Sequence, residues 1–144
     1  MNTKPQGAPT GLFAVLHAAH AAEAEVEAKL NAVHLSMAKL MALKALSEAG
    51  ESLPLGQLAG RLSCVKSNIT QLVDRLEADG LVARKLDPND RRTKLAVLTA
   101  AGRKACDEGT RVQRDVERSL LKRLTSDEAR MLETLVSKIG TSGR

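Results

Sequence analysis

The stretch that most constrains the fold runs from Leu58 to Gly102. Its pattern predicts a short helix, a turn of three or four residues, a longer helix with a polar face, and a hairpin with a basic tip. A helix of that kind fits the major groove of duplex DNA, and a basic loop beside it can reach the backbone or the minor groove. The order of these elements therefore indicates a helix-turn-helix protein that reads duplex DNA.

The composition favours helices for the rest of the chain. The 144 residues are enough for one domain with a substantial core, and Phe13 is the sole aromatic side chain. A core built from Leu, Val, Ala, Ile and Met suits packed helices better than a β-sandwich. The lack of aromatic platforms also argues against binding RNA or single strands by base stacking. We therefore expect a mainly α protein with a small β-hairpin.

The positive charge is unevenly distributed. The net charge is +5, yet residues 1–60 hold 4 Lys or Arg against 5 Asp or Glu, whereas residues 61–94 hold 8 against 5. A basic excess that starts with the helix-turn-helix segment permits a nucleic-acid partner. No apolar run approaches the roughly 18 residues of a membrane span, and the polar N-terminus does not resemble a signal peptide. We expect a soluble, cytoplasmic protein that does not bind membranes.

Apolar periodicity outlines the elements of the chain, after a disordered tail over residues 1–9. The first three predicted helices cover residues 10–33, residues 35–49 and a short segment that begins at Pro54. The next two cover residues 66–79 and residues 99–123, the latter with a break at Gly109, and the last begins at the capping box Thr125–Glu128. Two strands are predicted over residues 81–86 and 94–98. Helix 10–33 has an apolar stripe that it cannot bury alone, so it needs neighbours or a second subunit.

The polar face of helix 66–79 is the candidate for reading DNA. Its side chains have donors and acceptors that suit base edges and phosphates. The candidates are Lys66, Ser67, Asn68, Thr70, Gln71 and Arg75. Any surface helix also has a polar face, so this face alone supports a solvated helix equally well.

The basic hairpin tip is the candidate for a second contact with DNA. Arg91 and Arg92 follow Asp90 there, and arginine suits the negative potential of a narrow minor groove. Asp90 would brace an arginine rather than touch DNA, since a carboxylate repels phosphate. A charged tip that simply keeps the hairpin soluble is the alternative interpretation.

Three segments of this region resemble one family. Residues Leu72–Val82 (LVDRLEADGLV), Asp87–Arg92 (DPNDRR) and Leu98–Gly102 (LTAAG) are similar to the multiple-antibiotic-resistance regulator (MarR) family. The order of elements from Leu12 to Ile139 also fits the plan of that family. The signature from the helix to the hairpin is fairly specific, while the flanking helices match only in pattern.

The resemblance implies a homodimeric winged helix-turn-helix transcription regulator, more specifically a repressor that a small-molecule effector releases from a pseudo-palindromic operator. Residues 10–144 would form one domain. Within it, residues 10–33 and 99–140 would form an intertwined dimerisation region. Residues 35–98 would form the winged part, with the reading helix at 66–79 and the wing at 81–98.

The resemblance also assigns roles within the wing. By position, Arg92 matches the arginine that enters the minor groove, with Arg91 as its neighbour, and Asp74 matches the acidic residue that braces that arginine. Arg84 matches a basic position close to the DNA backbone. Lys94, on the second wing strand, completes the set of candidate DNA contacts.

One position departs from the family pattern. Val65 stands where relatives place a Ser or Thr that caps the reading helix, and valine has no oxygen for the free N–H groups, at a cost of ~1 kcal/mol. Ser63 or Ser67 would have to compensate. The start of the helix, and hence which side chains reach the bases, is left open.

The remaining polar residues carry weaker signals. His34, Met37 and Met41 lie in order near the region where the family binds ligands. Cys64 and Cys106 are best explained by packing, with thiol-based redox sensing as a minor alternative. His17 and His20 are three residues apart but lack further metal ligands, so we expect no metal and no cofactor.

The chain also lacks catalytic motifs, so we do not expect an enzyme. Two further hypotheses stay open from the residues. One is a protein–protein adaptor that uses the winged part as a scaffold without binding DNA, and the other is an accessory domain of an enzyme.

Overall fold

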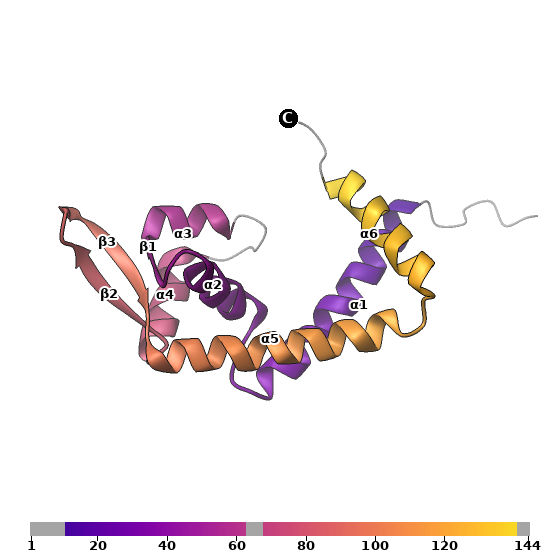
Figure 1. Ribbon diagram of the computed structural model, residues 1–144, viewed down its shortest axis with the longest axis horizontal. Helices are drawn as coiled ribbons and strands as arrows, with labels where there is room; N and C mark the ends of the chain where they lie inside the picture. The colour runs from indigo at the N-terminus through magenta and orange to yellow at the C-terminus, as the bar shows by residue number, and fades with distance from the viewer. Residues whose placement is uncertain (1–10, 63–67, 141–144) are drawn as a thin grey trace, which may run out of the picture.

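The computed structural model describes residues 11–62 and 68–140. Its elements, in chain order, are α1 (Gly11–Asn31), α2 (Met37–Glu48), β1 (Ser52–Pro54), α3 (Leu55–Arg61), α4 (Ile69–Ala78), β2 (Val82–Asp87), β3 (Asp90–Leu98), α5 (Ala100–Leu121) and α6 (Ser126–Gly140). Figure 1 shows α2, α3, α4 and the sheet gathered at one end, while α5 extends from them toward α6. The structure thus has a mainly helical body with a small sheet, as the sequence predicts.

The sheet has three antiparallel strands in the order β1-β3-β2. Val97 on β3 stands opposite both Ser52 on β1 and Ala83 on β2. The sequence predicts only the hairpin of β2 and β3, because β1 is three residues long and ends at Pro54, which is also the N-cap of α3. A strand that short has too few residues to show alternation.

The core lies mostly in the winged part of the molecule, which we define as residues 35–98, and Leu30 of α1 and Cys106 of α5 also belong to it. Leucine side chains from α2, α3 and α4 are fully buried there, together with Val82 at the start of β2. The largest fully buried side chains are Leu30, Leu40, Leu43, Leu46, Leu58, Leu76, Val73 and Val82. Packed leucine and valine therefore replace aromatic residues, as the composition predicts.

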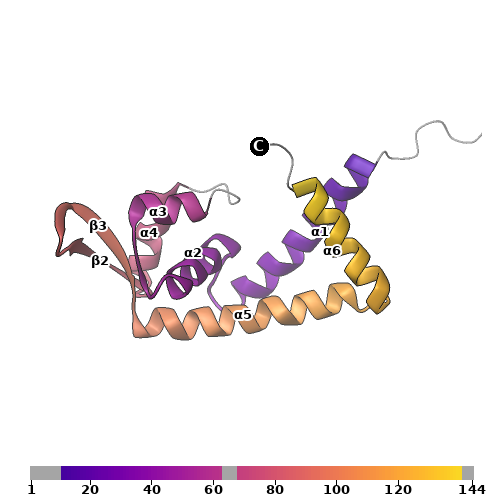
Figure 2. The same cartoon turned by 45° about the horizontal axis from the view of Figure 1, so that its top comes forward.

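Helix α5 joins the winged part to the far end of the molecule (Figures 1 and 2). It runs unbroken through Gly109, so the predicted break at that residue is wrong. The glycine is needed for packing instead: a Cβ atom there would lie 2.7 Å from Leu40 Cδ1 and 2.9 Å from Leu35 Cδ1. Gly102 is more restricted, because its Cβ would lie 2.0 Å from the carbonyl oxygen of Leu81. Both glycines let α5 approach the winged part closely.

The far end consists of two segments, the N-terminal half of α1 and the whole of α6. Both lie at the same end of the molecule in the two views (Figures 1 and 2). We call these two segments, with the end of α5, the arms. Helix α6 has no buried residue, and large apolar side chains of the arms are exposed. They are Leu12, Phe13, Val15, Leu16, Leu120, Met131, Leu132, Leu135, Val136 and Ile139. The described residues contain no helix long and apolar enough to cross a membrane.

Candidate nucleic-acid interface

The predicted reading helix begins at Ile69, three residues later than the sequence suggests, and Asn68 caps it. Asn68 Oδ1 accepts hydrogen bonds from the backbone N–H groups of Thr70 at 3.0 Å and Gln71 at 3.4 Å. An asparagine in this position satisfies donors that the first turn of a helix leaves free. Asn68 therefore supplies the capping oxygen that Val65 lacks.

Several residues considered for this start lie outside the described part of the chain. They are Ser63, Cys64, Val65, Lys66 and Ser67. Lys66 and Ser67 thus keep their predicted roles as candidate DNA contacts without a structural test.

The two faces of α4 separate cleanly. Leu72, Val73 and Leu76 are buried, while the predicted contacts Thr70, Gln71 and Arg75 are exposed. A groove of about 250 Å³ lies between this face and the start of α2. Its lining residues are Ser36, Ala38, Lys39, Asn68, Gln71, Leu72 and Arg75. The exposed face is therefore flanked by a second helix that carries the cation Lys39.

Arg84 on β2 is held against α4 by carboxylates. Its guanidinium donates to Asp74 Oδ1 at 2.5 Å, to Glu77 Oε1 at 3.3 Å and to the backbone oxygen of Thr70 at 3.3 Å. The hydrogen bond to Asp74 raises the pKa of Arg84 above its ordinary value, against the opposing effect of desolvation. Asp74 thus has a different arginine partner from Arg92, which the resemblance implied. The contact joins the reading helix to the first wing strand.

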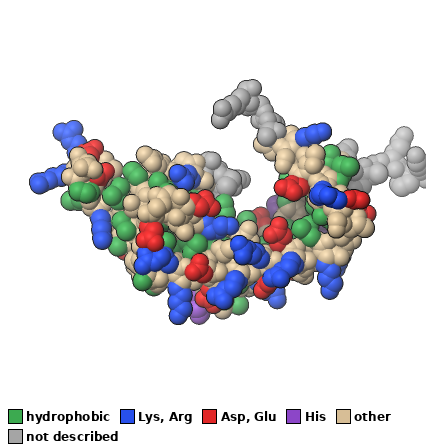
Figure 3. All heavy atoms as spheres, in the orientation of Figure 1, with side chains coloured by type: hydrophobic (Ala, Val, Ile, Leu, Met, Phe, Trp, Pro, Cys, Tyr) green, Lys and Arg blue, Asp and Glu red, His purple; other side chains and the backbone are tan. Residues whose placement is uncertain are grey.

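The wing tip is shaped by Asp90 through the backbone. Its Oδ1 accepts a hydrogen bond from the N–H of Arg92 at 3.0 Å, and its Oδ2 accepts one from the Thr93 hydroxyl at 3.0 Å. The side chains of Arg91, Arg92 and Lys94 are exposed. Lys and Arg side chains project from the end of the wing, as Figure 3 shows. Asp90 therefore fixes the loop and leaves the cations free to meet an anionic partner.

The three residues predicted to line a ligand pocket are His34, Met37 and Met41. Met41 lines a cavity of about 500 Å³, which His34 and Met37 do not line. Its lining residues are Met41, Lys44, Ala45, Glu48, Arg61 and Leu62. His34 is exposed and has a left-handed backbone with φ of 61°, in the turn between α1 and α2. Its conformation thus serves the turn.

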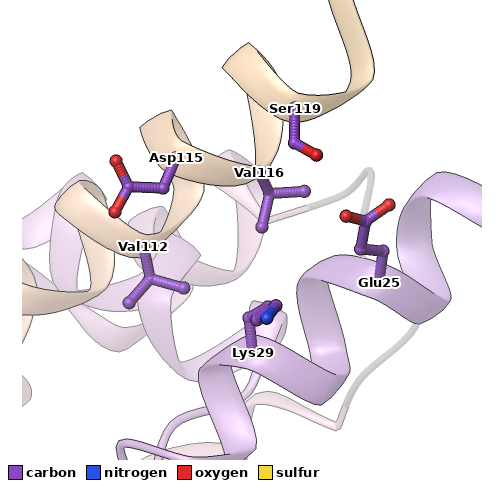
Figure 4. A pocket seen from close by; sticks show the side chains of 6 residues that line it. All are labelled: Glu25, Lys29, Val112, Asp115, Val116 and Ser119. Carbon is purple, nitrogen blue, oxygen red and sulfur yellow. The ribbon is translucent and has the colours of Figure 1, made fainter.

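A second cavity, of about 330 Å³, lies between α1 and α5 (Figure 4). Its lining residues are Glu25, Lys29, Val112, Asp115, Val116 and Ser119. Two valines and a serine from α5 face charged side chains from α1, which suits a ligand with both apolar and polar groups. Sequence reasoning missed this cavity because it joins residues about ninety positions apart, and neither helix has a motif there.

Cys106 lies on α5 and is buried, with 7% of its surface exposed. Burial raises the pKa of its thiol above the ordinary value, and a hydrogen bond with Thr110 opposes that shift only in part. A neutral, shielded thiol reacts slowly with oxidants. Cys106 therefore gives no support to redox sensing.

The predicted histidine pair lies on an exposed face of α1. His17 and His20 line a largely apolar hollow together with Phe13 and Leu16. Among the described residues, no three or more His, Cys, Asp or Glu side chains are grouped so that they could hold a metal ion.

Comparison with known proteins gives a consistent result. The model of the MarR family matches residues 35–94. The uncharacterized HTH-type transcriptional regulator YcgE of Bacillus subtilis is 32% identical over 112 residues, which cover 78% of this chain and 72% of YcgE. The multiple antibiotic resistance protein MarR of Escherichia coli is 39% identical over 72 residues, or 49% of this chain and 50% of that protein.

Solved structures resemble the whole fold. A probable transcriptional regulator from Pseudomonas aeruginosa has a TM-score of 0.78 at 28% identity, with 88% of this chain and 94% of that chain covered. A mutant of Escherichia coli MarR, solved in complex with operator DNA, has a TM-score of 0.77 at 26% identity and covers 90% of this chain and 93% of its own. The likeness therefore extends beyond residues 35–94 to the arms.

Proposed function

Because the chain belongs to the MarR family, we propose that it is a homodimeric, sequence-specific DNA-binding transcription regulator, and more specifically a repressor that a small ligand releases. The observation that carries the proposal is the exposed polar face of α4 beside a wing whose tip presents Arg91 and Arg92. A similar fold has been solved on operator DNA in Escherichia coli MarR. Because the proposed partner is duplex DNA, we also propose that the protein is located in the cytoplasm.

In this proposal α4 enters the major groove. Gln71 and Arg75 would contact base edges there, and Thr70 would contact base edges or phosphates. Lys66 and Ser67 belong to the same predicted surface.

The wing would lie over the adjacent minor groove. Arg92 would enter that groove with Arg91 beside it, and Lys94 would meet the DNA backbone. Arg84 acts differently, because Asp74 and Glu77 occupy its guanidinium. Arg84 positions the reading helix against the wing. Its guanidinium would lie near the DNA backbone but would not be free to bind a phosphate.

The arms would form the dimer. Their exposed apolar side chains need a cover, and a second copy offers an identical surface. We propose that residues 10–33 and 99–140 form this dimerisation region and that residues 35–98 form the DNA-binding part. Two reading helices related by a two-fold axis then lie about 34 Å apart and face a nearly palindromic site.

A ligand would act by favouring dimers in which the reading helices have a spacing that does not fit DNA. It can do so only to the extent that it binds the two arrangements with different affinities. The cavity between α1 and α5 is a suitable place, because both helices connect the arms to the winged part. The role predicted for His34, Met37 and Met41 stays a prediction.

A gel-shift titration against duplex DNA from upstream of the protein's own gene tests the proposal. We expect a retarded complex whose affinity falls steeply with salt concentration, because cationic side chains release counterions from the phosphates. Scrambled duplex of the same composition is the control. Equal affinity for both duplexes would exclude sequence-specific regulation, and no binding to either would favour a protein–protein adaptor.

A further inference from the structure

We propose that Glu27 is a positioning residue that fixes the joint between α1 and α2, and that this joint sets where the reading helices lie relative to the arms. The proposal rests on the proposed function for its consequence at DNA. The structural part of the proposal is that the angle between α1 and the winged part is fixed. This part rests on contacts within one protomer.

The first contact crosses from one helix to the other. The half-buried side chain of Glu27 on α1 accepts, through Oε1, a hydrogen bond from the backbone N–H of Met37, the first residue of α2. The Ser36 hydroxyl accepts a second one from the N–H of Lys39 at 3.1 Å. Helix starts have free N–H groups and a positive end of the dipole, so a carboxylate is favourable there. One of the two acceptors at this end of α2 therefore belongs to α1.

The second feature is the turn between the two helices. The N–H of Leu35 donates to the carbonyl of Leu30 at 3.0 Å, and the N–H of His34 donates to that of Asn31 at 3.1 Å. His34 has φ of 61°, which is the left-handed residue that ends a helix in this pattern. Leu30 and Leu35 are both buried. The backbone of the turn is therefore held on its inner side, and Glu27 closes the joint through a side chain.

The third feature is the close approach of α5. Gly109 leaves room for the side chains of Leu35 and Leu40, which a Cβ atom there would meet at less than 3 Å. Helices α1, α2 and α5 thus converge near the turn, and α1 and α5 are the two elements that lead to the arms. Without the Glu27 contact, α1 would lose this side-chain hydrogen bond to α2 and keep the backbone hydrogen bonds of the turn and the apolar packing at its C-terminal end.

A small change at this joint would have a large effect at its far end. A tilt of about 5° over a helix of roughly 30 Å, such as the 21-residue α1, moves the other end by about 2.6 Å. Neighbouring base pairs are about 3.4 Å apart along DNA. The dimer contains two such joints. If both are looser, the distance between the two reading helices would vary by about the length of one base pair.

The test compares Glu27→Ala, Glu27→Gln and the control Glu23→Ala, which removes the same charge from an exposed position of α1. The DNA probes carry two copies of the half-site that the wild-type protein selects from random duplexes, with the spacing lengthened or shortened by one base pair. We expect Glu27→Ala to bind the best spacing about tenfold more weakly and to discriminate less between spacings. Glu27→Gln, whose amide oxygen still accepts the bond, should stay within about twofold of wild type, as should Glu23→Ala.

Two measurements on the free protein separate this proposal from the proposed function. Hydrogen exchange of the Met37 amide should be about tenfold faster in Glu27→Ala than in Glu23→Ala, because only the first variant removes its acceptor. Spin labels can be attached at Ala78→Cys on the two protomers, in a background with Cys64→Ser and Cys106→Ala. The distances between the two labels should be spread over about twice as wide a range in Glu27→Ala as in Glu23→Ala. If Glu27→Ala fails to fold, Glu27→Asp replaces it, since its shorter side chain withdraws the acceptor while keeping the charge.

The outcomes are distinct. Unchanged exchange at Met37 would overturn the contact itself. If Met37 exchanges faster in Glu27→Ala, but this variant has the same spacing preference and label distances as Glu23→Ala, Glu27 has no positioning role. A wild-type protein that binds no duplex would remove the proposed function, and the exchange and the label distances would then decide about the joint alone.

Discussion

Leu43 on α2 and Leu135 on α6 are the same side chain in two environments. Leu43 has 0% of its surface exposed and Leu135 has 48%. The first lies in a core that consists mostly of residues of the winged part and also includes Leu30 of α1 and Cys106 of α5. The second lies on α6, which has no buried residue within one protomer. The hydrophobic core around the winged part is therefore complete within one protomer, whereas the large apolar side chains of the arms are left exposed.

This difference separates two tasks of the molecule. A DNA-binding surface must hold its side chains in place before DNA arrives, so the helix that carries it needs a packed core behind it. An arm that exchanges apolar contacts with a second copy needs the opposite, an apolar surface left open. Replacing residues on each side should therefore affect different measurements.

The largest effect should come from a charge on the arm. Leu135→Glu would place a carboxylate in the proposed dimer interface, at a cost of about 3–5 kcal/mol for an unpaired buried charge, and the two-fold symmetry repeats that cost. We expect sedimentation equilibrium to show a monomer at concentrations where wild type is a dimer. Leu86→Glu is the matched control, because Leu86 on the wing is 59% exposed but lies outside the arms. A dimeric Leu135→Glu would show that α6 is not part of the interface.

The next effect belongs to the winged part. Leu43→Ala would leave a cavity in the core and lower the free energy of unfolding by about 2–5 kcal/mol. Urea denaturation followed by far-ultraviolet circular dichroism measures it, with Leu86→Ala as the exposed control. We expect the remaining folded protein to keep its dimer dissociation constant. A variant that loses the dimer in step with stability would mean that the two regions do not behave independently.

The sequence predicts the helices well because their apolar periodicity reflects burial on one face. It misses β1, which is too short to show a period, and it places a break at Gly109 because glycine weakens isolated helices. In the folded chain, the packing of Leu35 and Leu40 against Gly109 outweighs that weakness. Both misses concern contacts between segments distant in sequence.

The site was predictable in type but not in its pairings. The exposed positions of Thr70, Gln71 and Arg75 follow from helical periodicity. The partner of Asp74 does not, because the ion pair with Arg84 depends on how β2 returns past α4. The hydroxyl expected near Val65 is likewise replaced by Asn68, a residue that the sequence also offers as a base reader.

A smaller effect should therefore follow from Asn68→Ala. Loss of the cap should destabilise α4 by ~1 kcal/mol, whereas Asn68→Asp keeps a capping oxygen and serves as the control for helix stability alone. Because the amide oxygen is already bonded within the helix, we expect binding to weaken evenly across duplex sequences. A selective change in the preferred base, measured by binding to a panel of single-base variants, would instead make Asn68 a base contact.

The smallest effect concerns Cys106, which lies on α5 but packs with the winged core. Burial raises the pKa of this thiol in the folded protein, so the unfolded chain releases the proton first as pH rises. Its contribution to stability should thus be complete below the thiol's ordinary range and decline as the pH rises through that range toward the raised pKa of the folded state. The chain has no Tyr, so Cys106→Ala in a Cys64→Ser background should reduce that alkaline loss measurably in urea titrations.

The alkylation rate of Cys106 tests whether the winged core alone shields this thiol. If it does, the rate at neutral pH should be the same in the monomeric Leu135→Glu variant as in wild type. Faster alkylation there would show that the arms, through α5, also hold the core closed.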